Sequence, residues 1–271
     1  MSKNISDIIV ITDLDNTLLT AKGGIPLYNV DMIEKFQRLG GKFTVATGRN
    51  VEAVKVLLSQ ISLNTPAITY NGGVLYDYRH NRILSKKLLP ESAKEVLKTL
   101  MHYFPKVGCE VMADNFRTYL INANDYTYNH LTDEKLSYVV TDIDSVKNGW
   151  IKILFADRQQ NLLKMRDFCK TLKCDDLDFI MTADTYFEIM PKGVSKGAAL
   201  YDLCKRCGIP KNNTIVVGDY YNDIEILQNA GLSVCVANAP DEIKNICQIV
   251  VPSCTDGGVG HLLAQLIENF S

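Results

Sequence analysis

The stretch IIVITDLDNTL, residues 8–18, decides the fold, because an unbroken apolar run ends there at two carboxylates, Asp13 and Asp15. Strands of parallel sheets are covered by helices on both faces and are therefore apolar along their whole length. Three further segments place polar residues at the end of a run, namely VATGR at 45–49, GVSKG at 193–197 and VVGDYYND at 216–223. Ligands of open α/β sheets bind just outside the carboxyl ends of the strands, so these four clusters are expected to meet at one crevice.

The bulk composition excludes several classes of protein. With 271 residues, 46% of them hydrophobic and 22% charged, the chain fits one large soluble domain or two modest ones. The net charge of −2 predicts no attraction to nucleic acid or to an anionic membrane. No apolar run approaches the roughly 20 residues of a membrane span. The N-terminal stretch MSKNISD lacks the apolar core of a signal peptide, so a cytoplasmic location is expected.

The eight cysteines are then expected to be thiols, since the cytosol keeps them reduced. Cys204 and Cys207 form a CxxC, but they also continue the helical spacing of Leu200 and Leu203. We therefore predict that they pack in the core, in preference to a metal or redox role.

The order of the predicted elements indicates an interrupted domain. Strands and helices alternate over residues 1–84 and again over 190–271, which predicts an α/β, doubly wound, mostly parallel sheet with a Rossmann-like core. Between them, strand-like runs follow one another closely, as in LDFIMTA and TYFEIMP at 177–191. This pattern favours an antiparallel sheet with helices on one face. We therefore predict an inserted α+β cap domain over residues 85–189.

The acidic residues at the strand ends have the composition of a metal site. Two carboxylates such as Asp13 and Asp15 repel each other by roughly 4 kcal/mol at about 4 Å if the effective dielectric constant is about 20. Mg²⁺ offsets such repulsion, and it takes oxygen ligands. Asp219 follows the buried run VVG and needs a partner, so we assign it to the metal as well. Asn222 and Asp223 begin the next helix, and one of them is also expected to cap it.

The remaining clusters have the composition of a phosphate site. Thr47, Gly48 and Arg49 lie between a predicted strand and a predicted helix, where Thr47 is either a helix N-cap or a hydroxyl donor to phosphate. Lys196 follows Ser195, a predicted N-cap, and lies in the first turn of a helix. A cation there opposes the helix dipole, so we expect Lys196 to face carboxylates and phosphate oxygens instead of water.

Two further residues leave alternatives open. Asn71 precedes Gly72 between two strand-like runs, which is typical of a tight hairpin turn, and the same turn could touch a substrate. Alternation in TYFEIMP places Tyr186 and Glu188 on one face of a strand. Glu188 either contacts the leaving group of a substrate or is a solvated or ion-paired carboxylate.

These four clusters, in this order, resemble the haloacid dehalogenase superfamily of phosphotransferases, and the insert resembles that of its Cof-type branch with an α/β cap. The residues that carry the resemblance are Asp13-Leu14-Asp15-Asn16-Thr17 for DxDxT, Thr47 for the second motif, Lys196 for the third, and Asp219, Asn222 and Asp223 for GDxxND. Asn16 stands where the family usually has glycine. Because asparagine tolerates unusual backbone angles, we expect only a local change there.

The resemblance implies a role for each motif residue. Asp13 would be the nucleophile that forms an aspartyl-phosphate, and Asp15 the general acid and then the base. Thr47 and Lys196 would orient the phosphoryl group. Ligands of Mg²⁺ would be Asp13, Asp15 through its backbone carbonyl, and Asp219, assisted by Asp223 or Asn222. Candidate substrate-binding residues are Thr47, Gly48, Arg49, Asn71, Glu188 and Asn222.

The expected function is a Mg²⁺-dependent phosphatase that acts on a small phosphorylated metabolite, such as a sugar phosphate. The expected protein is a monomer or a weak homodimer without nucleic-acid or membrane partners. A phosphomutase of the same superfamily is the enzyme alternative. A phospho-acceptor signalling module is the non-enzyme alternative, although it would need no inserted cap of about 100 residues to enclose a substrate. A P-loop NTPase is not expected, because GxxxxGK[ST] does not occur.

Overall fold

The computed structural model describes residues 4–270, and its chain divides into two compact units. The first unit comprises Met1–Arg49, Val54–Ser85 and Ser195–Ser271, and the second comprises Asn50–Ala53 and Lys86–Val194. Residues 1–3, which belong to the stretch from which a cytoplasmic location is expected, lie outside the described residues. Each unit has its own hydrophobic core, so each is described by itself.

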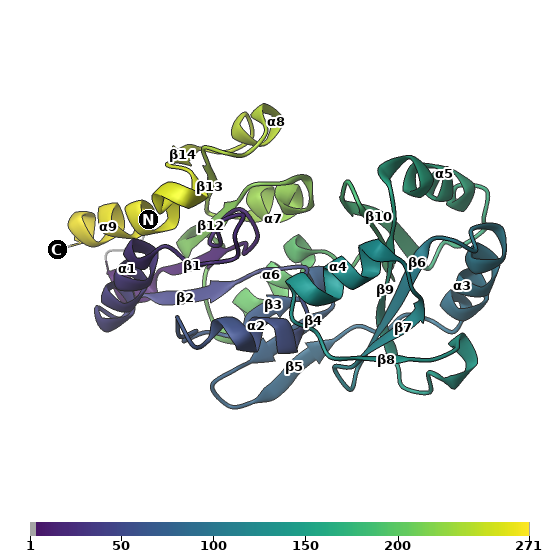
Figure 1. Cartoon of the computed structure of the whole chain (residues 1–271). Helices are drawn as coiled ribbons and strands as arrows, with labels where there is room; N and C mark the ends of the chain where they lie inside the picture. Colours follow the sequence, from purple (N-terminus) through teal and green to yellow (C-terminus); the bar gives the residue numbers. More distant parts are fainter. Residues whose placement is uncertain (1–3, 271) are drawn as a thin grey trace. The chain divides into compact units, whose positions relative to one another are not determined.

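A five-stranded parallel sheet forms the centre of the first unit (Figure 1). Its strands, in spatial order, are β14 (Ile249–Val251), β13 (Leu232–Val236), β12 (Thr214–Gly218), β1 (Ile9–Thr12) and β2 (Lys42–Val45). β1 pairs with β12 on one side and with β2 on the other, so strands from the two ends of the chain are neighbours. The predicted return of the core after the insert is therefore a continuation of the same sheet.

Helices cover both faces of this sheet, which confirms the doubly wound arrangement. Val10 of β1 packs in one cluster with residues of α1 and α9, whereas Ile9 and Ile11 pack in the opposite cluster with residues of α6 and α7. Burying one such side chain contributes about 1.5–3 kcal/mol. The helices are α1 (Leu27–Arg38), α2 (Val51–Leu57), α6 (Lys196–Cys207), α7 (Ile224–Asn229), α8 (Asp241–Lys244) and α9 (Gly258–Phe270).

The third strand of the core departs from a simple continuation of the parallel sheet. β3 (Ala67–Thr69) contacts the sheet through a single parallel bridge, Ala46–Ile68. It then forms a small antiparallel sheet with β4 (Val74–Asp77) and β5 (Arg82–Lys86). The turn between β3 and β4 is the 3₁₀ segment η2 (Tyr70–Gly72), which confirms the predicted hairpin at Asn71-Gly72. Five other 3₁₀ turns are described, namely η1 (Ile5–Asp7), η3 (Ile143–Ser145), η4 (Lys211–Asn213), η5 (Tyr221–Asp223) and η6 (Cys254–Asp256).

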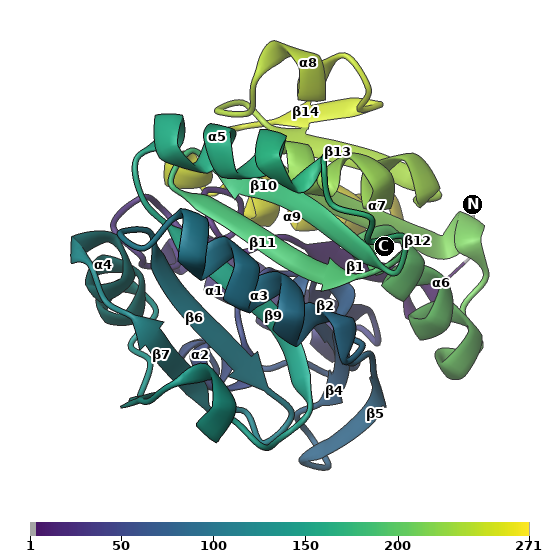
Figure 2. The same ribbon diagram turned by 90° about the vertical axis from the view of Figure 1, so that its right-hand side faces the viewer.

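The second unit is built on a six-stranded, mainly antiparallel sheet (Figure 2). In spatial order its strands are β10 (Leu177–Ala183), β11 (Tyr186–Pro191), β9 (Trp150–Ala156), β6 (Gly108–Ala113), β7 (Thr118–Asn122) and β8 (Tyr138–Val140), of which β8 pairs parallel to β7. Helices α3 (Ser92–Tyr103) and α5 (Gln159–Cys169) share an apolar cluster with alternate residues of β6, β9 and β11. The α+β layout is thus present, but the expectation of helices on one face holds only for α3 and α5. Helix α4 (Asp125–Asp133) packs on the opposite face, where its His130 contacts Glu110 of β6.

One helix and one strand of this unit have no counterpart in the prediction. Helix α4 (Asp125–Asp133) begins at Asn124, whose side chain accepts a hydrogen bond from the Thr127 N–H at 2.9 Å in a capping box. Edge strand β8 follows it. Among the described residues, no helix combines the length and apolar character that crossing a membrane requires.

Candidate active site

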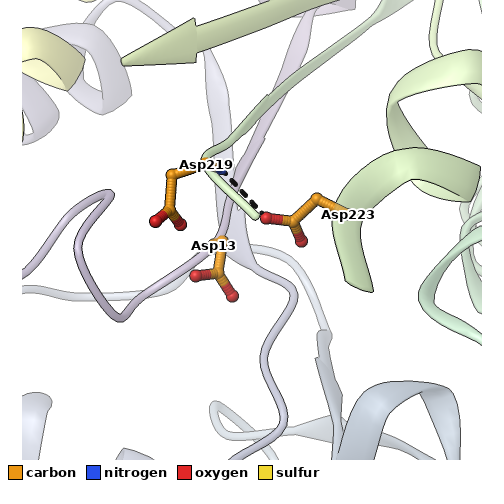
Figure 3. A group of neighbouring side chains, drawn as sticks. All are labelled: Asp13, Asp219 and Asp223. Atoms are coloured by element: carbon orange, nitrogen blue, oxygen red, sulfur yellow. Dashed lines mark hydrogen bonds between the residues drawn. The ribbon is translucent and has the colours of Figure 1, made fainter. Parts of the chain in front are cut away.

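Three buried carboxylates converge at the carboxyl ends of the parallel strands (Figure 3). Asp13 follows β1, Asp219 follows the neighbouring β12, and Asp223 belongs to η5. Each offers an oxygen, and these oxygens all lie within 4.8 Å of one another. The Asp13 N–H donates to the Val217 carbonyl at 2.8 Å, so the β1–β12 pairing continues up to the first carboxylate and fixes its position.

Lys196 is the cation of this cluster. Ser195 caps α6, since its hydroxyl accepts from the Ala198 N–H at 3.0 Å, which confirms the predicted N-cap. The Lys196 ammonium donates to Asp13 Oδ1 at 2.6 Å and to Asp223 Oδ1 at 2.7 Å, and only 1% of the residue is exposed. When ionised, three carboxylates and one ammonium leave two negative charges in a buried site.

This surplus changes the acidity of the cluster. Burial raises the pKa of Asp13 well above its usual value; Lys196 opposes the shift, while Asp223 and Asp219 reinforce it. Burial, followed by repulsion from Asp223, raises the pKa of Asp219 to about 7. Burial alone would lower the pKa of Lys196, but Asp13 and Asp223 raise it above its usual value. The lysine therefore stays charged, and the carboxylates lack further positive charge.

Asp223 holds the loop that presents Asp219. Its Oδ2 accepts from the Asp219 N–H at 3.0 Å and from the Tyr220 N–H at 3.3 Å, so of Asn222 and Asp223 it is Asp223 that binds these backbone groups. Gly218 makes room for this arrangement, because a Cβ there would lie 2.6 Å from Asp223 Oδ2.

Thr17 is a site residue to which sequence reasoning gave no role. Its buried hydroxyl donates to Asp219 Oδ1 at 2.7 Å, across a separation of 202 residues. The signal was its place as the last polar residue of DxDxT, immediately after the two carboxylates.

The oxygens that remain fit a divalent cation. Asp13 Oδ1 and Asp223 Oδ1 bind Lys196, Asp219 Oδ1 binds Thr17, and Asp223 Oδ2 binds the backbone. Within residues 4–270, Asp13 Oδ2 and Asp219 Oδ2 have no hydrogen-bond donor. A buried, all-oxygen donor set with two surplus negative charges matches Mg²⁺ in charge and in ligand type. The Asp15 side chain lies outside this carboxylate group, as expected if Asp15 offers its backbone carbonyl.

Thr47 lies after β2, completely buried. Its Oγ1 accepts from the Arg49 N–H at 3.1 Å, which leaves the hydroxyl hydrogen to donate to a phosphate oxygen. The alternative that Thr47 caps the next helix is wrong. Helix α2 begins at Val51, and the Asn50 Oδ1 accepts from the Ala53 N–H at 2.7 Å.

The hairpin residue Asn71 lies close to Thr47 and to the loop before Lys196. The Asn71 N–H donates to the Thr47 carbonyl at 2.9 Å, and a Cβ on Gly48 would lie 3.1 Å from the Asn71 amide. The Asn222 side chain donates to Asn71 Oδ1 at 3.4 Å.

The next residue of the turn, Gly72, approaches the loop before Lys196. A Cβ on Gly72 would lie 2.1 Å from the Ser195 carbonyl, so only glycine, here with φ +100°, permits this approach. Substrate contacts of Gly48, Asn71 and Asn222 stay predictions.

Asp15 forms an ion pair with Arg49. The Arg49 Nε donates to Asp15 Oδ2 at 3.0 Å, and its NH2 group donates to Asp15 Oδ1 at 2.7 Å. The Asp15 side chain is 53% exposed, whereas that of Arg49 is 12% exposed. Asn16 has φ +56°, the left-handed conformation that asparagine was expected to accommodate in place of glycine.

Glu188 lies in the second unit, on β11, and is 3% exposed. The Lys152 ammonium donates to its Oε1 at 2.7 Å, so Glu188 is ion-paired, which is one of the alternatives that the sequence left open. A contact of Glu188 with a substrate stays a prediction. Lys152 was missed, although a lysine inside the apolar run WIKILF was a signal that a buried partner exists.

The two cysteines of the CxxC are half-buried and pack against the core cluster under α6. This packing confirms the place in the core that was predicted for Cys204 and Cys207.

Comparisons with known proteins agree with this geometry. A family model described as haloacid dehalogenase-like hydrolase matches residues 10–263. Phosphatase YwpJ of Bacillus subtilis (strain 168) is 28% identical, with 96% of this chain and 99% of the relative covered. HMP-PP phosphatase of Serratia proteamaculans (strain 568) is 27% identical, with 95% and 94% covered. A crystal structure of a haloacid dehalogenase-like hydrolase from Bacteroides thetaiotaomicron superposes with a TM-score of 0.88 at 19% identity, with 96% and 99% covered.

Proposed function

Because the chain belongs to the haloacid dehalogenase-like hydrolase family, whose curated relatives are named phosphatases, we propose that it is a Mg²⁺-dependent phosphatase acting through an aspartyl-phosphate. It is an enzyme of the phosphoric monoester hydrolase class. The observation that carries the mechanism is the buried cluster of Asp13, Asp219 and Asp223 around Lys196, with its two surplus negative charges.

The first half-reaction transfers the phosphoryl group to Asp13. An Asp13 oxygen attacks phosphorus, an O–P bond forms, and the bond from phosphorus to the leaving oxygen breaks while Asp15 gives that oxygen a proton. Lys196 and the Thr47 hydroxyl supply positive charge and a hydrogen-bond donor for the phosphoryl oxygens. In the second half-reaction water attacks phosphorus, Asp15 takes its proton, and inorganic phosphate leaves as the Asp13 carboxylate is restored.

Mg²⁺ would be held by Asp13, Asp219 and the backbone carbonyl of Asp15, with Asp223 holding the loop behind them. When bound it supplies the positive charge that the cluster lacks and neutralises charge on the phosphoryl oxygens. This chain's own contribution is to fix the donors. The β1–β12 pairing positions Asp13, and Thr17 and Asp223 position Asp219.

The substrate is a small phosphorylated metabolite, such as a sugar phosphate, and we propose that it meets the enzyme in the cytoplasm. Similarity over nearly the full length of a relative named HMP-PP phosphatase supports this substrate class. If Glu188 contacts the leaving group, Glu188→Ala lowers kcat/KM for the best metabolite while barely altering hydrolysis of p-nitrophenyl phosphate. An equal loss on both substrates would place the effect of Glu188 in folding or in the catalytic core.

A screen of phosphorylated metabolites tests the proposal. Purified protein with Mg²⁺ is expected to release inorganic phosphate from at least one of them, and excess chelator is expected to stop the release. Conversion of a sugar phosphate into its isomer without phosphate release would instead show a phosphomutase. Full activity in excess chelator would contradict the metal-dependent mechanism.

A further inference from the structure

Arg49 grips Asp15 at two points. Its Nε and NH2 groups each donate to a different oxygen of the carboxylate, at 3.0 and 2.7 Å. Such a two-point contact between planar groups fixes direction as well as distance, and lysine cannot reproduce it. The guanidinium is the more buried partner and the carboxylate the more exposed one.

The backbone of Arg49 is hydrogen-bonded to two neighbouring segments, the loop that contains Thr47 and the turn that begins at Tyr70. The Arg49 N–H donates to the Thr47 hydroxyl oxygen at 3.1 Å, and the Arg49 carbonyl accepts from the Tyr70 N–H at 3.0 Å. Asp15, in contrast, belongs to the turn after β1, where the Thr17, Leu18 and Leu19 N–H groups all converge on the Leu14 carbonyl. Arg49 therefore ties the side chain of this turn to the loop that carries Thr47.

We infer that Arg49 is the positioning residue of Asp15 and acts on the reaction through Asp15, an inference that rests on the proposed function of Asp15 as acid and base. The carboxylate of Asp15 is hydrogen-bonded to Arg49 and lies outside the group formed by Asp13, Asp219 and Asp223. Arg49 thus keeps the Asp15 side chain apart from the metal-binding carboxylates and directed for proton transfer, while the Asp15 backbone carbonyl stays available to the metal. The sequence had placed Arg49 among the substrate-binding residues instead.

Two aryl phosphates distinguish these roles. Phenyl phosphate has a basic leaving group that needs a proton, whereas 2,4-dinitrophenyl phosphate has one that leaves without it. The constant kcat/KM covers only the steps up to departure of the leaving group. Arg49→Lys, which keeps the charge and loses the two-point contact, is therefore expected to lower kcat/KM at least tenfold for phenyl phosphate and less than threefold for 2,4-dinitrophenyl phosphate.

A double-mutant cycle completes the test. In an Asp15→Asn background, Arg49→Lys is expected to cause no further loss on phenyl phosphate, because the group through which Arg49 is inferred to act on the reaction is already removed. Arg206→Lys is the matched control, since Arg206 forms an exposed ion pair with Asp202 on α6 at 2.9 Å. This control is expected to leave kcat/KM unchanged for both phenyl phosphate and 2,4-dinitrophenyl phosphate.

Two results would overturn the inference. Equal losses on both aryl phosphates that persist in the Asp15→Asn background would make Arg49 a ligand of the phosphoryl group. If Arg49→Lys keeps the wild-type kcat/KM for both aryl phosphates, the ion pair between Arg49 and Asp15 does not contribute to catalysis. If the unaltered enzyme hydrolyses neither aryl phosphate and no metabolite, the proposed function itself fails, which is a distinguishable outcome.

Discussion

Lys196 in the first unit faces two carboxylates with a third beside them, whereas Lys152 in the second unit faces Glu188. Both lysines are almost completely buried, and both lie 2.6–2.7 Å from their partners. The difference is the balance of charge. The charges of the pair in the second unit cancel, whereas the cluster in the first unit has two negative charges in excess when all of its groups are ionised. Burial, together with this excess, is why the pKa values of Asp13 and Asp219 are raised. A buried surplus of negative charge needs a cation to offset it, whereas the charges of Lys152 and Glu188 already offset each other.

The largest expected effect comes from removing the nucleophile. Asp13→Asn is expected to lower kcat about a thousandfold or more, because an amide does not attack phosphorus. The same change removes one of the surplus charges, so the thermal midpoint of the metal-free protein is expected to stay equal or rise. Phosphate release and a thermal melt measure the two effects, and more than a tenth of wild-type activity would refute the assignment.

The balanced pair is expected to behave in the opposite way. Glu188→Gln removes the charge that faces Lys152 and is expected to cost about 3 kcal/mol of unfolding free energy. Trp150 is the single tryptophan of the chain and is buried in the second unit, so its fluorescence during urea unfolding reports on that unit. The matched control is the double variant Lys152→Met with Glu188→Leu, which is expected to recover most of the loss. If Glu188→Gln unfolds with the same free energy as the wild type, the Lys152–Glu188 pair does not stabilise the second unit, and the contrast with the cluster around Lys196 is lost.

A histidine in the second unit gives a smaller, pH-dependent effect. His130 is buried, with Nδ1 3.0 Å from Glu110 Oε2 and Nε2 3.5 Å from Glu134 Oε1. Burial alone would lower the pKa of His130, but Glu134 and Glu110 raise it to about 10. The folded state therefore binds the proton more tightly than the unfolded state, in which the pKa is about 6.5.

The contribution of His130 to stability is accordingly full below about pH 6.5 and is lost as the pH rises through about 10. His130→Gln is expected to cost about 2 kcal/mol at pH 6.5. The gap between the variant and the wild type should narrow steadily toward pH 10, as measured by urea unfolding monitored at Trp150. A gap that is constant with pH would mean that His130 is neutral in the folded protein.

The sequence predicted what depends on local order and missed what depends on register. Asp13, Asp219 and Lys196 each follow or begin a periodic element, so the order of these elements was enough to predict their convergence at one end of a parallel sheet. The pairs Arg49–Asp15 and Lys152–Glu188 join residues 34 and 36 positions apart. Which strand lies next to which, and in which register, decides such pairs, and neither is written in the local pattern.

Helix α4 was missed for a different reason. Its segment DYTYNHLTD contains Leu131 as its single aliphatic residue, so it lacks the apolar stripe by which surface helices are found. It buries His130 against Glu110 instead and starts at a capping box formed by Asn124 and Thr127. Hydrophobic periodicity does not detect a helix that buries polar side chains. The N-cap signal of Asn124 and Thr127 is what the sequence offers for predicting such a helix.

The claim that the carboxylates around Lys196 bind Mg²⁺ is tested most directly by calorimetric titration of Mg²⁺ into chelator-treated full-length protein. We predict that the wild type binds one Mg²⁺ per chain and that Asp219→Asn weakens binding at least tenfold. The control Asp144→Asn changes an exposed carboxylate that pairs with Lys94 and Lys98, so it should bind as the wild type does. Equal binding by Asp219→Asn and the wild type, or no binding by the wild type, would contradict the account.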